Sequence, residues 1–142
     1  ARVLGDLYDE IITTGYDSYM SYMESLPVIT LDDLVNSLPT PIAPNAMGYQ
    51  EIRLQILATS VKNHALRERI ENTSRDMHAR WESGLDYVES KLEPGLRIDR
   101  RVFTIMLLVQ TMYYRTLLGD VGFTVDEYRA FVREKLVLKT DV

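Results

Sequence analysis

One segment near the C-terminus constrains the fold of this chain more than any other. It reads DRRVFTIMLLVQTMYYRTLLGD over residues 99–120. Its apolar side chains are not confined to one helical face, so a helix here must be covered on nearly all sides. It falls short of the roughly 20 apolar residues of a membrane span, and it is interrupted by Thr104, Gln110, Thr111 and Arg115. We therefore predict a buried helix and no membrane span.

Apolar residues recur at steps of three and four residues through nearly the whole chain, which is the spacing of one face of an α-helix. Prolines and glycine divide this pattern at Pro27, at LPTPIAP and at EPG. No segment alternates as a β-strand does. The fold class is therefore all-α, a bundle of about six helices, and the length suits one domain over residues 1–142. Helices are expected over residues 1–26, 30–37, 48–63, 64–92, 99–120 and 124–136, followed by a tail.

Four predicted helix starts carry a side chain that can accept a hydrogen bond from the first-turn backbone. These N-cap residues are Thr30, Asn63, Asp99 and Thr124. Glu127 follows Thr124 by three residues and completes a capping box. The caps predict where these four helices begin.

The charge distribution argues against nucleic-acid binding by this chain alone. The formal net charge is −5, and the only basic residues among the first 60 are Arg2 and Arg53. Nucleic acid is bound by clustered Lys and Arg, and the densest basic stretch, RIDRR, has only three arginines. The chain has no cysteine, which excludes disulfides and thiolate metal sites and fits a reducing, cytoplasmic location.

Enzyme signatures in the sequence are thin. There is no glycine-rich phosphate loop, no GxSxG and no HExxH motif. His78, Glu82 and Asp86 share a helix face and could in principle hold a metal, but the solvated side of a helix explains them better. We expect no catalytic residues, no metal site, no cofactor and no enzymatic activity.

Nine tyrosines and six methionines are the most distinctive feature of the composition, and many fall on apolar helix faces. Met adapts to irregular shapes, and Tyr and Trp bring a polar group into an apolar wall. Such side chains suit a cavity for a small, mostly apolar ligand. The alternative is a filled core in which they only touch one another. The predicted ligand-binding residues are Tyr16, Tyr19, Met23, Met77, Trp81, Met106, Gln110 and Tyr113.

A helix that is apolar all round needs more cover than one small bundle provides. A second copy of the chain would supply it, since the last helix also has more apolar surface than one narrow stripe. Two helices from each subunit would then form a four-helix interface with two-fold symmetry. We predict a homodimer with Val109, Met112, Thr116, Phe131 and Val132 near the axis.

The order of elements resembles the C-terminal domain of TetR-family transcriptional regulators. The resemblance rests on NHALRERI opening a long helix that contains Trp81, on PGLRIDRRV before the very apolar helix, and on LLGDVGFTVDEYRAFVREKL at the end. It implies that the last two helices form the dimer interface and that the preceding ones enclose an effector pocket. It also implies that ligand binding shifts the first helix and re-spaces DNA-binding heads.

The helix-turn-helix head of that family is absent from this chain, so DNA would be a partner only through a missing N-terminal domain. Either the sequence is a piece of a longer regulator or it is a stand-alone homologue. Two functions therefore remain open. The first is a ligand-sensing and dimerisation domain, and the second is an α-helical homodimeric binding or scaffold protein without DNA-binding activity.

Overall fold

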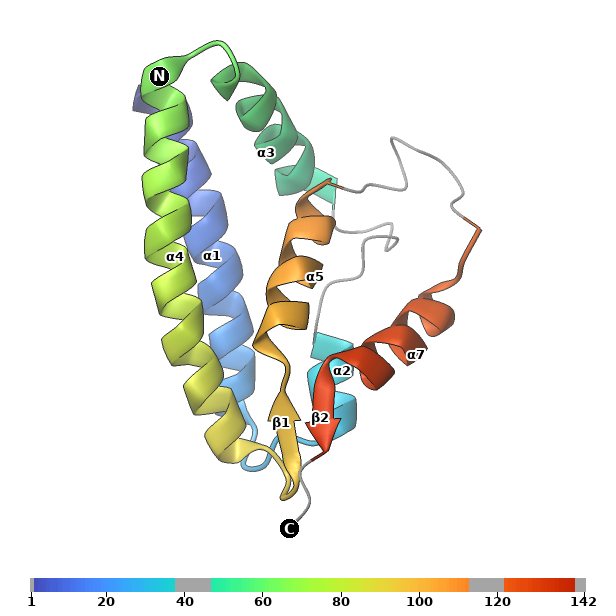
Figure 1. The fold of residues 1–142 in the computed structure, drawn as a ribbon. Coiled ribbons are helices and arrows are strands. Elements are labelled where there is room, and N and C mark those ends of the chain that lie inside the picture. The colour runs from blue at the N-terminus through green and yellow to red at the C-terminus, as the bar shows by residue number, and fades with distance from the viewer. Residues whose placement is uncertain (1, 38–46, 113–121, 140–142) are drawn as a thin grey trace. The chain divides into compact units, whose positions relative to one another are not determined.

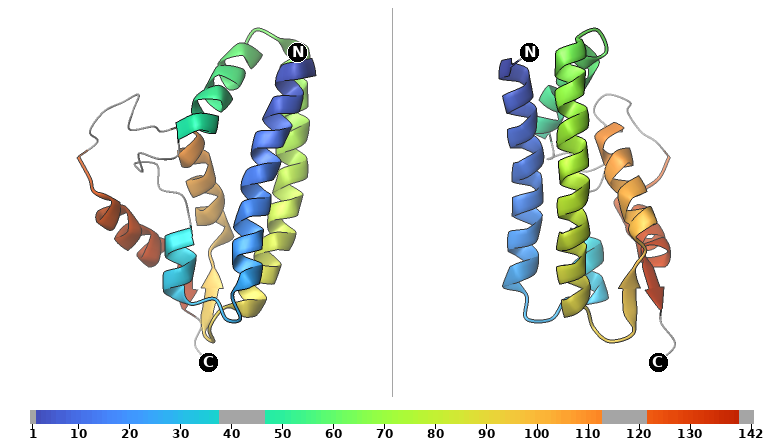
Figure 2. Two further views of the ribbon diagram at one scale, coloured as in Figure 1. Left: turned by 180° about the vertical axis from the view of Figure 1, so that it is seen from behind. Right: turned by 60° about the vertical axis from the view of Figure 1, so that its left-hand side comes forward.

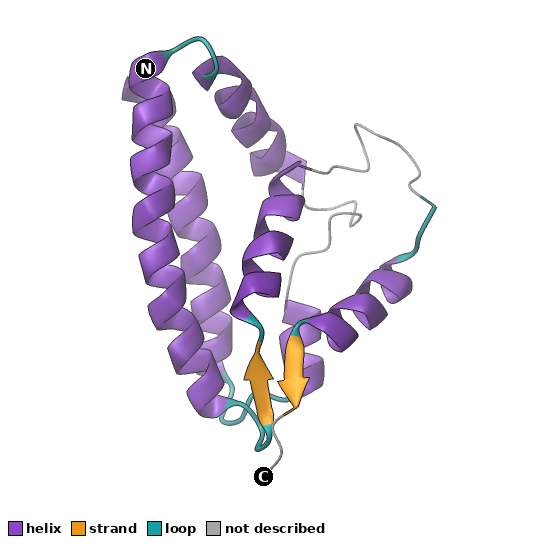
Figure 3. Cartoon of the chain, in the orientation of Figure 1, coloured by secondary structure: helices purple, strands orange, loops and turns teal. Residues whose placement is uncertain are grey.

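The structure is a computed structural model that describes residues 2–37, 47–112 and 122–139. These residues form six helices and two short strands (Figures 1 and 3). The all-α prediction is confirmed. In chain order the elements are α1 (Arg2–Ser25), α2 (Leu31–Ser37), α3 (Met47–Ser60), α4 (His64–Lys91), β1 (Leu96–Ile98), α5 (Arg100–Met112), α7 (Val125–Lys135) and β2 (Val137–Lys139). The part of the predicted helix that follows Met112 lies outside the described residues.

The chain divides into two compact units. The first unit contains α1, α3 and α4 as far as Tyr87. The second contains α2, the end of α4 from Val88, both strands, α5 and α7. The single domain expected over residues 1–142 stays a prediction.

In the first unit, α1 and α4 lie side by side, and α3 packs against α1 (Figure 2). The three- and four-residue spacing of the sequence places apolar side chains of all three helices on the faces that meet. Their removal from water stabilises the unit. This core consists of Tyr8, Ile56, Leu66 and Ile70, with Leu4, Leu7, Ile11, Ile12 and Leu57 packed against it.

Helix α4 begins where its cap predicts. The side-chain oxygen of Asn63 accepts a hydrogen bond from the Leu66 backbone N–H at 3.1 Å, and the Asn63 carbonyl accepts one from Arg67. Helix α1 ends at Ser25, two residues before Pro27. A proline disfavours the helical conformation at the residue before it, which here is Leu26. This explains why α1 ends at Ser25.

In the second unit, β1 and β2 form a two-stranded antiparallel sheet in which Ile98 pairs with Val137. Just beyond the sheet, the Asp99 N–H donates to the Leu136 carbonyl at 2.7 Å. The prediction of a tail after the last helix is wrong, because Val137–Lys139 is a strand. The physical reason is tertiary: Leu136 and Val137 are buried, and the backbone beside them finds its partner in β1. A three-residue strand is too short to show alternation in the sequence.

The remaining three caps lie in the second unit, and all are confirmed. The Thr30 hydroxyl accepts from the Asp33 N–H while the Asp33 carboxylate accepts from the Thr30 N–H. Asp99 accepts from the Val102 N–H at 3.1 Å. Thr124 and Glu127 form the complete capping box before α7.

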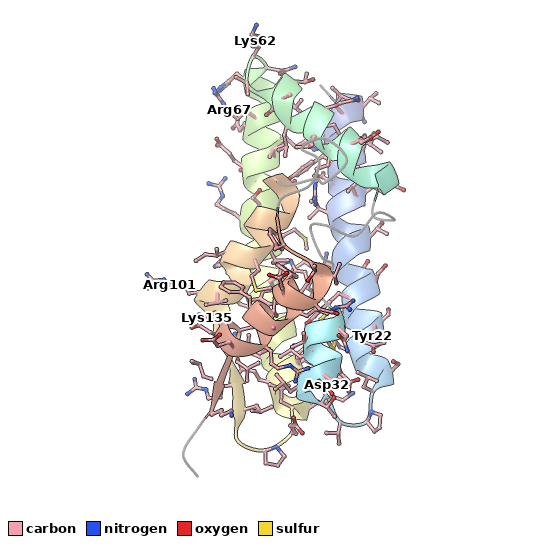
Figure 4. The ribbon with its side chains drawn as sticks, turned by 90° about the vertical axis from the view of Figure 1, so that its right-hand side faces the viewer. Tyr22, Asp32, Lys62, Arg67, Arg101 and Lys135 are labelled. Atoms are coloured by element: carbon pink, nitrogen blue, oxygen red, sulfur yellow. The ribbon has the colours of Figure 1, made fainter. Side chains whose placement is uncertain are left out.

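The segment before α2 is fixed to the end of α4 by backbone hydrogen bonds. The Ile29 N–H donates to the Lys91 carbonyl, and the Ile29 carbonyl accepts from the Glu93 N–H. Helix α2 packs against α7, where Arg133 forms an ion pair with Asp32, the residue labelled on α2 in Figure 4. These contacts connect α2 to the end of α4 and to α7 within the second unit.

Candidate functional site

The first unit contains an aromatic contact between α1 and α4, made by Tyr16, Tyr19 and Trp81. The ring centroids of Tyr16 and Trp81 are 4.8 Å apart, and those of Tyr19 and Trp81 are 5.2 Å apart. Both pairs meet edge to face, the arrangement that the aromatic quadrupole favours. Two tyrosine rings from one face of α1 therefore pack against Trp81.

Tyr16 is held in place by polar groups of α4 and α1. Its hydroxyl donates to the Arg80 carbonyl at 3.0 Å. The Arg80 guanidinium lies 4.5 Å from the centre of the Tyr16 ring, a cation–π contact, and donates to Asp17 at 3.2 Å. These partners fix the orientation of the ring at the edge of the aromatic contact.

A glycine lets Tyr16 approach α4 closely. A Cβ atom at Gly84 would lie 2.8 Å from the Tyr16 hydroxyl oxygen and 3.1 Å from the Met20 sulfur. Real Cβ atoms essentially never approach another atom to less than 3.0 Å, so the Tyr16 hydroxyl would have to move. A side chain at position 84 would therefore force Tyr16 to shift, so Gly84 allows the aromatic contact in its present geometry.

The burial of the predicted ligand-binding residues is graded. Tyr16 and Trp81 are half-buried, whereas Tyr19, Met23 and Met77 are buried. The contact is thus partly accessible to solvent at Tyr16 and Trp81, and its other predicted members are covered. Such a surface can receive an apolar or aromatic group, and Arg80 and Asp17 can offer polar contacts beside it.

Five of the eight predicted ligand-binding residues belong to the first unit, and the structure places two of them, Tyr16 and Tyr19, in contact with a third, Trp81. Met106 is buried and belongs to the second unit. The side chain of Gln110 and the whole of Tyr113 lie outside the described part of the chain. The pocket therefore stays a prediction.

Sequence reasoning missed Arg80 and Gly84, which define how Tyr16 sits. Gly84 follows Trp81 by three residues and so occurs on the same helix face one turn later. A glycine inside a long helix costs stability relative to Ala. This cost was the signal in the sequence that a close approach occurs there.

The predicted dimer residues are only partly described. Phe131 is 52% exposed, and Ile105 on α5 is 54% exposed. Val132, in contrast, is 1% exposed and packs inside the chain, because adjacent helical residues point about 100° apart. The side chains of Val109 and Met112 and the whole of Thr116 lie outside the described residues. Figure 4 shows the exposed side chains of Arg101 on α5 and Lys135 on α7 extending outward.

Of the three residues on α4 that could share a metal by their spacing, His78 and Asp86 are exposed and Glu82 is half-buried. The Nε2 atom of His78 is 4.0 Å from a Glu82 carboxylate oxygen. Among the residues described, no three His, Asp or Glu side chains are grouped so that they could hold a metal ion. The structure thus adds nothing in favour of a metal there.

A second, polar contact joins α1 to α4 closer to the N-terminus. Arg69 donates to the carboxylates of Asp9 and Asp6 at 2.7 and 2.5 Å, and Thr73 donates to Asp9 at 2.5 Å. Hydrogen bonds to Asp9 and Asp6 raise the pKa of Arg69 above its ordinary value. A Cβ atom at Gly5 would lie 2.6 Å from Cδ of Arg69, so this contact also depends on a glycine.

Comparison with protein-family models, with curated proteins and with solved structures finds no match to this chain. None of the helices described combines the length and the apolar character that crossing a membrane requires. The features of the described residues that bear on function are therefore the aromatic contact of the first unit and the exposed apolar residues of the second.

Proposed function

We propose that this chain is a non-catalytic, cytoplasmic ligand-sensing and dimerisation domain of a TetR-like transcriptional regulator. Its effector is a small, mostly apolar molecule. DNA is bound by an N-terminal helix-turn-helix that these residues do not include. The observation that carries the proposal is the aromatic contact, in which Trp81 meets Tyr16 and Tyr19 at a half-exposed site between two long helices.

The chemistry of this site supports an apolar effector. Aromatic ring edges and methionine sulfur atoms form adaptable walls with few polar anchors. Met77 and Met23 are buried on the same two helices, α4 and α1. An effector that inserts its apolar part beside Trp81 would replace ring–ring contacts with ring–ligand contacts at little cost in buried area.

Dimerisation is supported by the surface of the second unit. Phe131 and Ile105 expose about half of their side chains on the two helices for which the sequence predicts the interface. Covering such residues stabilises an assembly by about 25 cal/mol per Å² of apolar area. A homodimer through α5 and α7 would remove both side chains from water.

The chain carries its own probe for the proposed site, because Trp81 is its only tryptophan. We would titrate the protein with the neutral dye N-phenyl-1-naphthylamine and follow Trp81 emission. Saturable quenching at a stoichiometry near one dye per chain is expected. Met77→Ala should weaken dye binding while destabilising the fold by less than a core substitution, which costs roughly 2–5 kcal/mol. Leu66→Ala, in the core beside Tyr8, is the matched control.

The alternative, a stand-alone α-helical homodimeric scaffold protein, is favoured by one observation. Tyr16 and Tyr19 both contact Trp81, and Tyr16 packs over Gly84, as residues of a filled core would. If Met77→Ala, Met106→Ala and Gln110→Ala are all as destabilising as Leu66→Ala and the dye does not bind, the scaffold function replaces the sensing function. A basic helix-turn-helix unit encoded ahead of this sequence would decide for the regulator.

A further inference from the structure

Helix α1 is attached to α4 at two separate places, and the second combines ring contacts with the ion pair between Asp17 and Arg80. The polar contact near its start joins Asp6 and Asp9 to Arg69. The aromatic contact near its end joins Tyr16 and Tyr19 to Trp81. The two helices run alongside each other through both contacts (Figure 2).

The segment of α1 between the two contacts, residues 10–15, ends in three poor helix formers. These are Thr13, Thr14 and Gly15. Threonine is branched at Cβ and loses side-chain freedom in a helix, and glycine loses the most backbone entropy of any residue. Thr14 and Gly15 are exposed, and in the part of the chain that the structure describes no atom of another segment lies within 4 Å of a Cβ position at Gly15. Neither propensity nor packing at Gly15 therefore holds α1 helical at this point.

We propose that α1 is a hinged helix, with residues 2–12 and 16–25 opening independently about Thr13–Gly15. The half before the hinge stays in register with α4 through Arg69. The half after it responds to whatever occupies the aromatic contact. The regulatory meaning of this response rests on the proposed ligand-sensing function, but the hinge itself does not.

The two attachments of α1 to α4 determine which part of α1 moves when a molecule binds at the aromatic contact. A molecule that separates Tyr16 from Trp81 and moves the half of α1 after Gly15 must also break the ion pair between Asp17 and Arg80. A displacement of the half before Thr13 either breaks the ion pairs of Arg69 with Asp6 and Asp9 or carries the start of α4 with it. Because Arg69 binds two carboxylates, we expect the first half of α1 to stay with the facing turns of α4 when the second half moves.

Amide hydrogen exchange of the ligand-free protein, followed by NMR, tests the hinge. In an α-helix the N–H of residue i bonds to the carbonyl of residue i−4, so the amides of residues 17–19 report on the hinge. We expect their protection factors to be at least about 10-fold below those of residues 8–12 and 21–24. Gly15→Ala should raise protection at residues 17–19 about 2- to 5-fold. Ser21→Ala, at another exposed position of α1, should leave these amides unchanged. Uniform protection along α1 would overturn the hinge.

A second pair of variants tests whether the two halves are independent. Arg69→Gln removes both ion pairs, and Asp6→Asn removes one of them from an exposed carboxylate should the first variant fold poorly. Protection at residues 8–12 should fall at least about fivefold in Arg69→Gln, while residues 21–24 stay within twofold. An equal fall in both halves would show that α1 opens as one unit and would overturn the proposal. Hydrogen exchange is measured on the ligand-free protein. A failure of the dye titration would therefore count against the proposed ligand-sensing function and would not affect the test of the hinge.

Discussion

The side chain of Arg69 crosses α1 directly over Gly5, so that a Cβ atom at Gly5 would lie 2.6 Å from Cδ of Arg69 and 3.0 Å from its Nε. From this position Arg69 reaches Asp6 and Asp9, which lie one and four residues further along α1. An apparently dispensable glycine near the start of a helix is thus part of an interhelical contact.

Two glycines of α1 should respond oppositely to the same substitution. The methyl group of Gly15→Ala meets no described atom within 4 Å, and this variant should be more stable by about 0.5–1 kcal/mol, the usual gain for an exposed helical position. Gly5→Ala should fail to give this gain, because the methyl group displaces Arg69. Urea unfolding measures both. In an Arg69→Ala background, Gly5→Ala should recover the gain, and a Gly5→Ala variant that is as stable as Gly15→Ala would contradict the close contact.

Gly84→Ala should disturb the aromatic contact through Tyr16. The new methyl group would collide with the Tyr16 hydroxyl, which lies 2.8 Å from the Cβ position. We expect a shift in the emission maximum of Trp81 and a loss of roughly 1–3 kcal/mol of stability, the range typical of overpacking. Combining it with Tyr16→Phe removes the colliding oxygen and should restore most of the loss. No change in Trp81 emission in Gly84→Ala would argue against this packing.

Tyr8 should make stability depend on pH in the alkaline range. Burial raises the pKa of its hydroxyl above 10.0, outweighing the hydrogen bond with Ser74 that lowers the pKa. In the unfolded chain Tyr8 loses its proton near its ordinary pKa, while in the folded state it holds the proton to higher pH. The stability contributed is therefore complete below pH 10 and is lost as pH rises through the folded-state pKa. Urea unfolding of wild type and of Tyr8→Phe, compared between pH 8 and 11, separates the contribution of Tyr8 to the free energy of unfolding from that of the other tyrosines. Parallel curves would show that Tyr8 does not contribute.

Phe131→Glu should break the proposed homodimer. Placing a carboxylate in an apolar interface leaves a charge without water or a partner, which is costly. We expect the dimer dissociation constant in sedimentation equilibrium to rise at least about 100-fold, which corresponds to about 2.8 kcal/mol. Val61→Glu, at an exposed apolar residue of the first unit, is the control and should leave association unchanged. A wild-type chain that sediments as a monomer at micromolar concentration refutes the interface itself.

This chain should not bind DNA on its own. Its net charge is −5, and the first 60 residues contain two basic side chains, so few phosphate contacts can be made. Fluorescence anisotropy with a labelled duplex at low salt, where electrostatic binding is strongest, should show no saturation below about 10 µM. Sub-micromolar binding to any duplex would overturn the assignment of DNA contact to a separate domain.

The helices and their starting points could be predicted because the interactions that define them are local. Thr30, Asn63, Asp99 and Thr124 each bond to a backbone group three residues away, within the reach of a sequence pattern. The same holds for the end of α1 before Pro27. A cap or a break depends on a few neighbouring residues, whatever the rest of the chain does.

The contacts between segments far apart in the chain were decided by the tertiary structure. Nothing local distinguishes Val137–Lys139 from a tail, and it became a strand because β1 supplies its hydrogen-bonding partner about 40 residues earlier. The aromatic residues Tyr16, Tyr19 and Trp81 were predictable as a group from their spacing. That Arg80 would cover the Tyr16 ring, that Gly84 would admit it and that Gly5 would admit Arg69 depends on how closely two helices approach. Sequence periodicity fixes which face of a helix is apolar, but the distance and register between two such faces follow only from packing their side chains together.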